Sequence, residues 1–240
     1  MTYSHSWSRV TTLPSIVPIT RRFSSPPRAG RRERRRAEIR DRLFQAALQL
    51  FADRGFLETT VADITEAADV GKGTFFNYFP TKEHVLATFG AERIAVIERA
   101  HEKAKTSSEP VLVVIQELLT RLADDYSGNA ALLRAIYAAH ASCPEVRAEL
   151  QKRLHRGRRL MAAMFELARE RGEIGSEIPP EELARLTQVV FLGVTLSWAM
   201  NPESSLRKTT EAVWNLVRPS FSVHDPRRGP KQRSRPAHHA

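Results

Sequence analysis

Apolar residues recur at helical spacing through most of this 240-residue chain, and that periodicity limits the fold more than any other feature. In the segment that contains Ile39, Leu43 and Leu50, apolar side chains return every three or four positions. Proline, glycine and asparagine separate one such segment from the next, and no two segments show the apolar and polar alternation of paired strands. We therefore expect an all-α protein of about nine helices.

Several of the expected helices have recognisable ends. Gly55 stands where a left-handed C-terminal cap belongs, and Thr60 with Asp63 has the spacing of a capping box at the start of a short helix. Pro80 must end one helix, and Thr81 is placed to cap the next. We expect helices over residues 34–54, 61–68, 72–78, 82–105, 111–126, 130–141, 144–171, 180–200 and 204–217.

The composition favours a globular protein of a reducing compartment. Cys143 is the single cysteine, so the chain can form no internal disulfide and has no cysteine pair for a metal site. Pro14 and Pro18 interrupt the short apolar stretch near the start, and we expect no segment with the roughly 18 apolar residues of a membrane span. We interpret the protein as cytoplasmic, with no metal and no cofactor.

The positive charge lies at the two ends of the chain. Residues 1–108 contain 18 Lys and Arg against 12 Asp and Glu, residues 109–221 contain 14 of each, and residues 222–240 contain 5 against 1. A basic front of this kind attracts phosphate backbones or an anionic membrane. Residues 1–30 and 222–240 have the composition of a disordered basic extension and a disordered basic tail. Because the periodic pattern begins only near Arg31, whether residues 1–30 belong to the natural product stays open.

The stretch VGKGTFFNYFPTKEHVL, residues 70–86, crowds four aromatic residues behind a glycine-rich turn. A phosphate-binding loop is excluded, because its glycines are five apart and follow a strand, whereas here two glycines are two apart and follow a helix. Phe75 and Phe79 share one face of the short helix, so we expect them to pack on the preceding helices. Phe76 and Tyr78 point elsewhere, since a helix of barely two turns cannot bury every face.

Two short helices joined by a tight turn, between two longer helices, form the pattern of a helix-turn-helix. From Ile39 to Leu86, through "AALQLFADRGF" and "TTVADITEAADVGKGTFFNYFPTKEHVL", the sequence resembles the TetR family of transcription regulators without a gap. The resemblance implies a DNA-binding domain over residues 31–82 and a ligand-binding and dimerisation domain over residues 83–221. It also implies a repressor that binds a palindromic operator as a dimer and is released by a small apolar effector.

The DNA-facing residues follow from the same resemblance. Asn77 can read adenine through two hydrogen bonds, and Gly73 leaves room for close approach to DNA. Phe76 stands where the family often has tyrosine, so it offers only apolar contact, and Asp69 occupies a turn position that is often glycine. The arginines at 31–36 are equally compatible with an arm that reaches DNA and with a solvated leader. The expected DNA-binding residues are Arg36, Thr60, Lys72, Gly73, Thr74, Phe76, Asn77, Tyr78 and Lys82.

The resemblance places the dimer contact on the last two long helices, residues 180–200 and 204–217. Their apolar residues are equally those of an intramolecular core. Effector contacts are sought among soft and aromatic side chains of the middle helices, although each is more often core than ligand contact. The candidates are Tyr137, His140, Met161, Met164, Phe165, Phe191 and Trp198.

Three other functions compete with the repressor hypothesis. No H-E-x-x-H or G-x-S-x-G motif is present, so we expect no enzyme. Basic residues ahead of an amphipathic helix also suit a peripheral membrane-surface protein, which would bind anionic lipid without needing Lys72 or Asn77. A transcriptional activator of the same fold is the third alternative.

Overall fold

The computed structural model describes residues 30–126, 129–175 and 177–221, and these segments are helical with no strand among them. The all-α prediction is confirmed. Except for Gly30, the predicted extension over residues 1–30 and the predicted tail over residues 222–240 lie outside the described residues. The helices are α1 (Arg31–Arg54), α2 (Val61–Ala67), α3 (Lys72–Phe76), α4 (Lys82–Thr106), α5 (Val111–Asp124), α6 (Ala130–Ser142), α7 (Pro144–Glu170), α8 (Pro180–Met200) and α9 (Leu206–Val217), followed by the 3₁₀ helix η1 (Arg218–Phe221).

Several helix ends differ from the sequence prediction. α1 begins three residues earlier, at Arg31, because the Glu33 side chain accepts a hydrogen bond from the Gly30 amide at 3.2 Å and caps the first turn. α3 ends at Phe76 because the amides of Asn77 and Tyr78 bond back across only three residues, so the last turn is tighter than an α-helix. α9 begins at Leu206, two residues later than expected.

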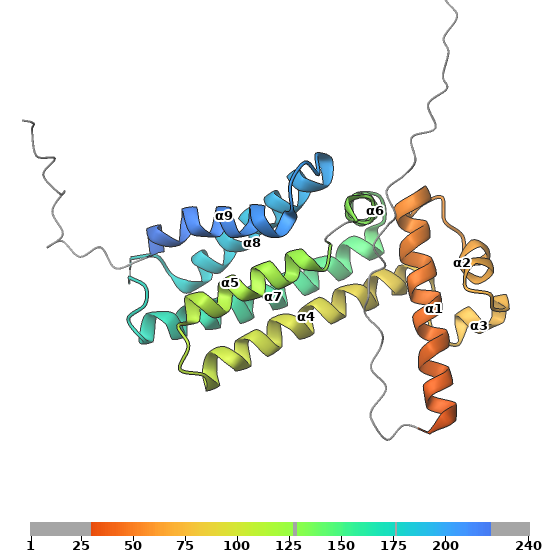
Figure 1. Ribbon diagram of the computed structural model, residues 1–240, viewed down its shortest axis with the longest axis horizontal. Coiled ribbons are helices and arrows are strands. Elements are labelled where there is room, and N and C mark those ends of the chain that lie inside the picture. The colour runs from red at the N-terminus through yellow and green to blue at the C-terminus, as the bar shows by residue number, and fades with distance from the viewer. Residues whose placement is uncertain (1–29, 127–128, 176, 222–240) are drawn as a thin grey trace, which may run out of the picture.

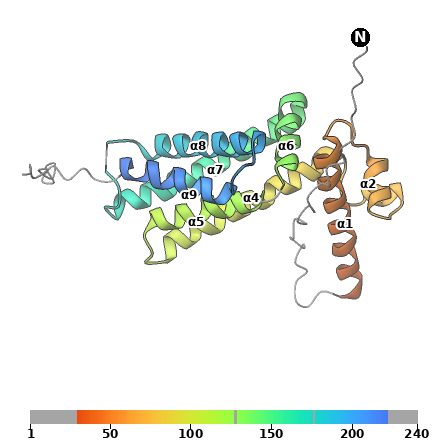
Figure 2. The ribbon, with the colours of Figure 1, turned by 45° about the horizontal axis from the view of Figure 1, so that its top comes forward.

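α1, α2 and α3 form one end of the molecule, and α5, α7, α8 and α9 form an elongated body beside them (Figure 1). α4 starts beside α1 and runs along the body, so it belongs to both parts (Figures 1 and 2). α6 lies where the body meets α1 and packs against it. Any displacement of α4 or α6 therefore moves the three-helix end relative to the body.

Two clusters of buried apolar residues hold the molecule together. The first contains Leu43, Phe51 and Phe75 from the three-helix end together with Leu132 and Ile136 from α6. The second lies within the body, among α4, α5, α7, α8 and α9. The first core therefore continues past residue 82, the position at which the sequence suggests a domain boundary.

Much of the surface of α8 is exposed to solvent, although the helix is strongly apolar. It contains an 18-residue window with mean hydropathy 1.4, which meets the length and composition of a membrane-crossing helix, so the expectation that no segment does so is wrong. The core helix of a soluble protein passes the same test, and α8 packs against α6, α7 and α9. Only 33% of the window is buried, so much of its apolar surface is uncovered in the single chain.

Candidate DNA-binding surface and ligand cavity

Local geometry that the sequence predicts is found at the start of α2 and in the turn between α2 and α3. Thr60 Oγ1 accepts a hydrogen bond from the Asp63 amide at 3.2 Å, and Asp63 Oδ2 accepts one from the Thr60 amide at 2.8 Å, so the capping box is confirmed. Asp69 has φ 51°, the left-handed geometry expected of it in this turn. Gly71 caps α3 with extended backbone. Gly55 has positive φ, but its ψ of 157° lies outside the left-handed helical region that we expected.

The aromatic cluster divides between two environments. Phe75 and Phe79 are 0% and 1% exposed, and their rings lie 5.6 Å apart in the first core. Phe76, the residue next to Phe75, is 52% exposed. The predicted division is therefore confirmed for Phe75, Phe79 and Phe76, whereas Tyr78 is partly buried against the same core.

The remaining predicted DNA-facing residues lie near that outward face. Lys72, Gly73 and Asn77 are exposed, and Thr74 and Tyr78 are partly buried. Arg36, on α1, is exposed, and its guanidinium carbon lies 5.9 Å from the centre of the Tyr78 ring. Thr60 is also exposed, at the start of α2. The fold thus presents side chains of α1, α2 and α3 at one end of the molecule.

Lys82 has partners within the protein. Its ammonium group donates hydrogen bonds to the carbonyl oxygens of Phe56, Leu57 and Thr59 at 2.8, 3.1 and 2.9 Å, and it lies 4.6 Å from the centre of the Phe56 ring. These bonds fasten the start of α4 to the loop between α1 and α2. A DNA contact by Lys82 stays a prediction, and the structure gives this side chain a structural role.

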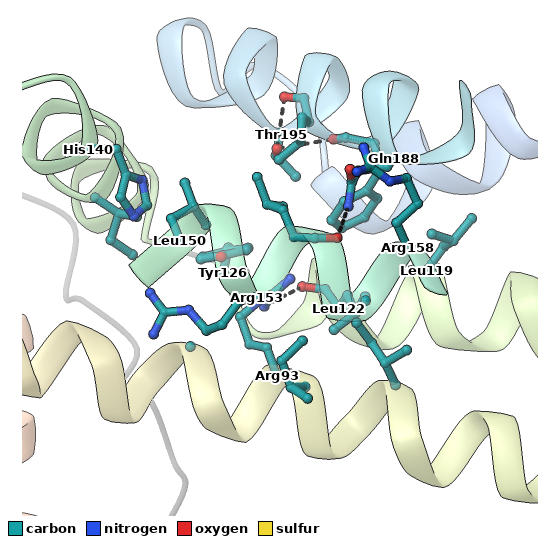
Figure 3. Close-up of a pocket in the computed structure, with 18 of the residues that line it drawn as sticks. Arg93, Leu119, Leu122, Tyr126, His140, Leu150, Arg153, Arg158, Gln188 and Thr195 are labelled. Atoms are coloured by element: carbon teal, nitrogen blue, oxygen red, sulfur yellow. Dashed lines mark hydrogen bonds between the residues drawn. The ribbon is translucent and has the colours of Figure 1, made fainter. Parts of the chain in front are cut away.

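A cavity of about 170 Å³ lies in the body, lined by residues of α4, α5, α6, α7 and α8 (Figure 3). For scale, an engineered protein cavity of about 150 Å³ holds benzene. Gly157 lets α7 approach α4 closely, since a Cβ there would lie 3.2 Å from Ile97 Cδ1. The cavity is therefore large enough for a small organic ligand and is bounded by the helix that reaches the DNA-binding end.

Four of the seven predicted ligand contacts line this cavity: Tyr137, His140, Met161 and Phe191. The other three do not line it. Met164 and Phe165 are fully buried in the second core. Trp198 is buried in the first core, where its indole N–H donates to the Ser204 carbonyl at 2.6 Å. Their large apolar side chains pack in the protein core. Residue type alone does not show whether such a side chain packs in the core or contacts a ligand.

Several residues that line the cavity were not predicted as ligand contacts because they are charged or polar. They are Arg93, Tyr126, Arg153, Arg158, Thr187 and Gln188. Arginines on amphipathic helices usually face solvent, so an arginine in the sequence does not by itself predict a cavity-lining residue. Arg93 follows Phe89 by four positions and precedes Ile97 by four, and that spacing on an apolar face was the available signal.

The polar groups of the cavity have well-defined surroundings. Tyr137 donates a hydrogen bond to the Leu192 carbonyl at 3.1 Å, and its hydroxyl lies 2.7 Å from Thr195 Oγ1. Burial, together with the positive charge of Arg153, lowers the pKa of His140 to about 4, so the imidazole is neutral at neutral pH. Its buried Nδ1 has no hydrogen-bond partner.

A second cavity, of about 240 Å³, lies between α5, α8, α9 and η1. Leu119, Thr187 and Phe191 line both cavities. Motion of the Phe191 ring would therefore change the shape of both.

Comparison with known proteins relates both the three-helix end and the body to one family of bacterial regulators. Residues 43–88 match the model of bacterial regulatory proteins of the tetR family, and residues 115–213 match that of the tetracyclin repressor-like C-terminal domain. The transcriptional regulator TcmR of Streptomyces glaucescens is 28% identical over 85% of this chain and 93% of its own length. The regulator EthR of Mycobacterium tuberculosis is 28% identical over 80% of this chain and 92% of its own length.

Solved structures agree with this class. The TetR-family repressor FadR of Thermus thermophilus, solved with lauroyl-CoA, has TM-score 0.57 and 27% identity over 80% of this chain and 98% of its own. SmeT in its triclosan complex shares the fold, with TM-score 0.66 and 18% identity over 84% of this chain and 99% of its own.

The fold, with an exposed recognition helix at one end and a cavity in the body, is that of a one-component helix-turn-helix regulator. The chain belongs to the TetR family of transcriptional regulators. It is a DNA-binding regulator that responds to a small molecule. Its relatives are transcriptional regulators, a class that in general does not catalyse reactions.

Proposed function

We propose that this protein is a cytoplasmic repressor that binds an inverted-repeat operator as a homodimer. It leaves the operator when a small, largely apolar effector fills the first cavity, which is lined by α4 to α8. The observation that carries the proposal is the split of α3, with Phe75 and Phe79 anchored in the core and Lys72, Phe76 and Asn77 exposed. A rigid scaffold that presents a short helix in this way suits insertion into the major groove.

Base recognition is assigned to Lys72, Thr74, Phe76 and Asn77. Phosphate contact is assigned to Thr60 and Tyr78, which position the helix without reading sequence. The exposed Arg36 guanidinium, stacked near Tyr78, adds positive charge beside the same surface. Gly73 leaves space for the DNA backbone or a base edge.

The dimer contact is assigned to α8 and α9. Their uncovered apolar side chains are Leu186, Val189, Val190, Leu196, Met200 and Leu216, with exposed fractions from 37% to 79%. Gly193 lies on the same helix with nothing within 4 Å of a Cβ built on it, so a partner helix could approach closely there. Leu183 and Trp214, on the same two helices, are 2% exposed and belong to the second core.

α4 is the element that would carry the effector signal. It contributes Phe89, Gly90 and Arg93 to the cavity wall, and its first residue, Lys82, is bonded to the loop between α1 and α2. A ligand that binds one position of α4 better than another shifts the separation of the two recognition helices. In B-DNA that separation must be near 34 to 36 Å, one helical turn.

Selection of bound sequences from random DNA tests this function, followed by titration of the selected duplex with wild type and with Lys72→Ala/Asn77→Ala. We expect an enriched inverted repeat, and a loss of affinity of at least about tenfold in the double variant. Vesicles of anionic lipid are the control. Binding to such vesicles that is equal in both proteins, together with no enriched repeat, would establish the membrane-surface alternative instead.

An activator would show the same selected sequence, so a second measurement separates the two. The selected duplex is placed over a promoter in a transcription reaction with purified polymerase. We expect the protein to reduce transcript yield, whereas a rise in yield would identify an activator.

A further inference from the structure

The charged side chains that line the first cavity all have the same sign. Among the described residues, the lining contains Arg93, Arg153 and Arg158, together with the neutral His140, and no aspartate or glutamate. Arg93 is neutralised, because its guanidinium lies 3.4 Å from Asp125 and 4.3 Å from the centre of the Tyr126 ring. The net positive charge of the cavity lining therefore comes from Arg153 and Arg158.

Arg153 is held in position without an ion pair. Its Nη1 donates a hydrogen bond to the Ala87 carbonyl at 2.9 Å, and no carboxylate of the described residues lies within ion-pair distance of it. Glu149, one turn earlier on α7, lies 3.7 Å from Lys152, and its negative charge favours the cationic form of Arg153 without forming an ion pair with it. Burial lowers the pKa of Arg153, which means that the cationic form bears a desolvation cost. A half-buried guanidinium in this state gains free energy when an anion binds.

A slot in α4 accommodates the Arg153 guanidinium. A Cβ at Gly90 would lie 2.4 Å from Arg153 Cζ and 2.5 Å from its Nε, so a side chain at this position would displace the guanidinium from its present place. Gly90 itself lines the cavity. Gly90, which leaves room for the Arg153 guanidinium, thus lies on α4, the helix that leads to the DNA-binding end.

His140 lies at the same end of the cavity as Arg153, with Leu150 near them (Figure 3). Its buried Nδ1 makes no hydrogen bond to any residue that the structure describes. A neutral imidazole can present one N–H, and an oxygen acceptor bound by Arg153 would be placed to receive it. From this polar end the cavity continues between apolar side chains that include Phe89, Leu122, Met161 and Phe191.

We propose that the effector is an amphipathic monocarboxylate, whose carboxylate binds Arg153 and His140 and whose apolar part fills the cavity. The inference rests on the proposed function, in which this cavity holds the effector. The planar guanidinium matches a carboxylate through parallel N–H bonds, and arginines without acids in the lining disfavour a cationic ligand. Because Ala87 and Gly90 both contact Arg153, the head group binds directly against α4.

Calorimetric titration with four probes that share one tail tests the inference: octanoate, 1-octanol, octylamine and octyl phosphate. We expect octanoate to bind at least about tenfold more tightly than 1-octanol, since a hydrogen bond between charged groups is stronger than one that involves a neutral hydroxyl. Octylamine should bind more weakly than both. Tighter binding of octyl phosphate than of octanoate would overturn the carboxylate assignment, and so would the absence of octanoate binding.

Two variants locate the head group. Arg153→Gln removes the cation, and Gly90→Ala displaces it while leaving it charged, so both should remove the preference for octanoate over 1-octanol. Lys152→Gln, a loss of the same charge on the exposed side of α7, should keep it. Equal preference in wild type and Arg153→Gln would refute the site.

Operator binding measured without probe separates this inference from the proposed function. Each variant should retain wild-type affinity for the selected duplex and a wild-type melting temperature, which shows that it is folded. If octanoate binds with the expected preference but no variant or wild type binds the duplex, the repressor function fails and the carboxylate site stands. If the duplex binds and the head-group preference is absent, the carboxylate site fails and the repressor stands.

Discussion

Phe76 is the residue whose role the structure sharpens most. Its ring is 52% exposed and lies edge-on to the buried Phe75 ring at a centroid distance of 5.6 Å. The ring is therefore held from behind by the core while its outer edge is free. Without a hydroxyl group, such a side chain can distinguish bases only through apolar contact, and the thymine methyl is the apolar feature of the major groove.

Replacing thymine by deoxyuridine in the operator tests this contact, because the change removes only the methyl group. At one thymine of a half-site we expect the substitution to weaken wild-type binding about threefold to fourfold for each half-site changed, from roughly 0.8 kcal/mol per buried methyl group. The Phe76→Ala variant should bind both duplexes equally. A uniform response of wild type at every thymine would show that Phe76 reads no particular base.

Lys82 allows a direct choice between a structural and a DNA-contacting role. Lys82→Met keeps the aliphatic stem but removes three hydrogen bonds to loop carbonyls, so we expect it to lower the free energy of unfolding by about 1–2 kcal/mol. The salt dependence of operator binding should be unchanged. A log-log slope smaller by about 0.9, without a change in melting temperature, would indicate a phosphate contact instead.

His140 makes stability depend on pH. Its pKa is about 4 in the folded protein and near 6.5 in the unfolded chain, so the unfolded state binds more protons between these values. Stability is therefore lost as the pH falls from about 6.5 toward about 4. We expect wild type to lose a few degrees more in Tm than His140→Gln between neutral and acidic buffer, because about 1 kcal/mol shifts Tm by roughly 2–4 °C. Parallel melting curves of both proteins against pH would contradict this assignment.

At the scale of elements, the recognition helix depends on its neighbours. α3 has five residues and no side-chain cap, too short to be stable alone. It is held by Phe75 and Phe79 in the core and by the fixed entry of α2 at Thr60. The order of α3 therefore comes from α1, α2 and the start of α4.

Loss of the α2 cap should reveal that dependence. Thr60→Ala removes both side-chain bonds to Asp63, and we expect a loss of about 1 kcal/mol in the free energy of unfolding. Thr60→Ser, which retains the hydroxyl, is the matched control and should stay close to wild type. Chemical denaturation of the three proteins measures the difference, and equal midpoints would show that the capping box does not support the fold.

At the scale of the whole molecule, α8 and α9 are the helices to which we assign the dimer contact. α8 covers the cavity with Thr187 and Phe191 on one face and exposes Val189 and Val190 on another. Its high mean hydropathy fits a helix that contacts its own core on one side and a partner on the other. Effector binding and dimer geometry thus share one helix.

Charge placed on that surface should separate the copies. Val189→Glu together with Leu216→Glu introduces four carboxylates into a two-fold contact, and we expect dissociation to monomers with weaker operator binding. Leu57→Glu, at another exposed apolar side chain on the loop after α1, is the control and should remain dimeric. Light scattering measures both masses, and an unchanged dimer in the double variant would place the contact elsewhere.

The sequence by itself determined the helical fold and the orientation of the recognition helix. Spacing identified Phe75 and Phe79 as inward-facing because a two-turn helix has few ways to place four aromatic rings. Thr60 and Asp63 likewise identified a cap from local hydrogen bonding alone. Such features depend on residues close together in the chain, so local pattern is sufficient to find them.

Only the tertiary structure decided which residues meet in the cavity. Arg153 and Gly90 are far apart in the sequence and form one slot because α4 and α7 pack closely, while Met164 and Phe165 face the core instead. The bonds from Lys82 to the loop between α1 and α2 likewise became visible only in the tertiary structure, while its contact with DNA stays a prediction. Which side chains of two distant helices meet depends on how those helices pack against each other, and residue type and spacing do not specify that packing.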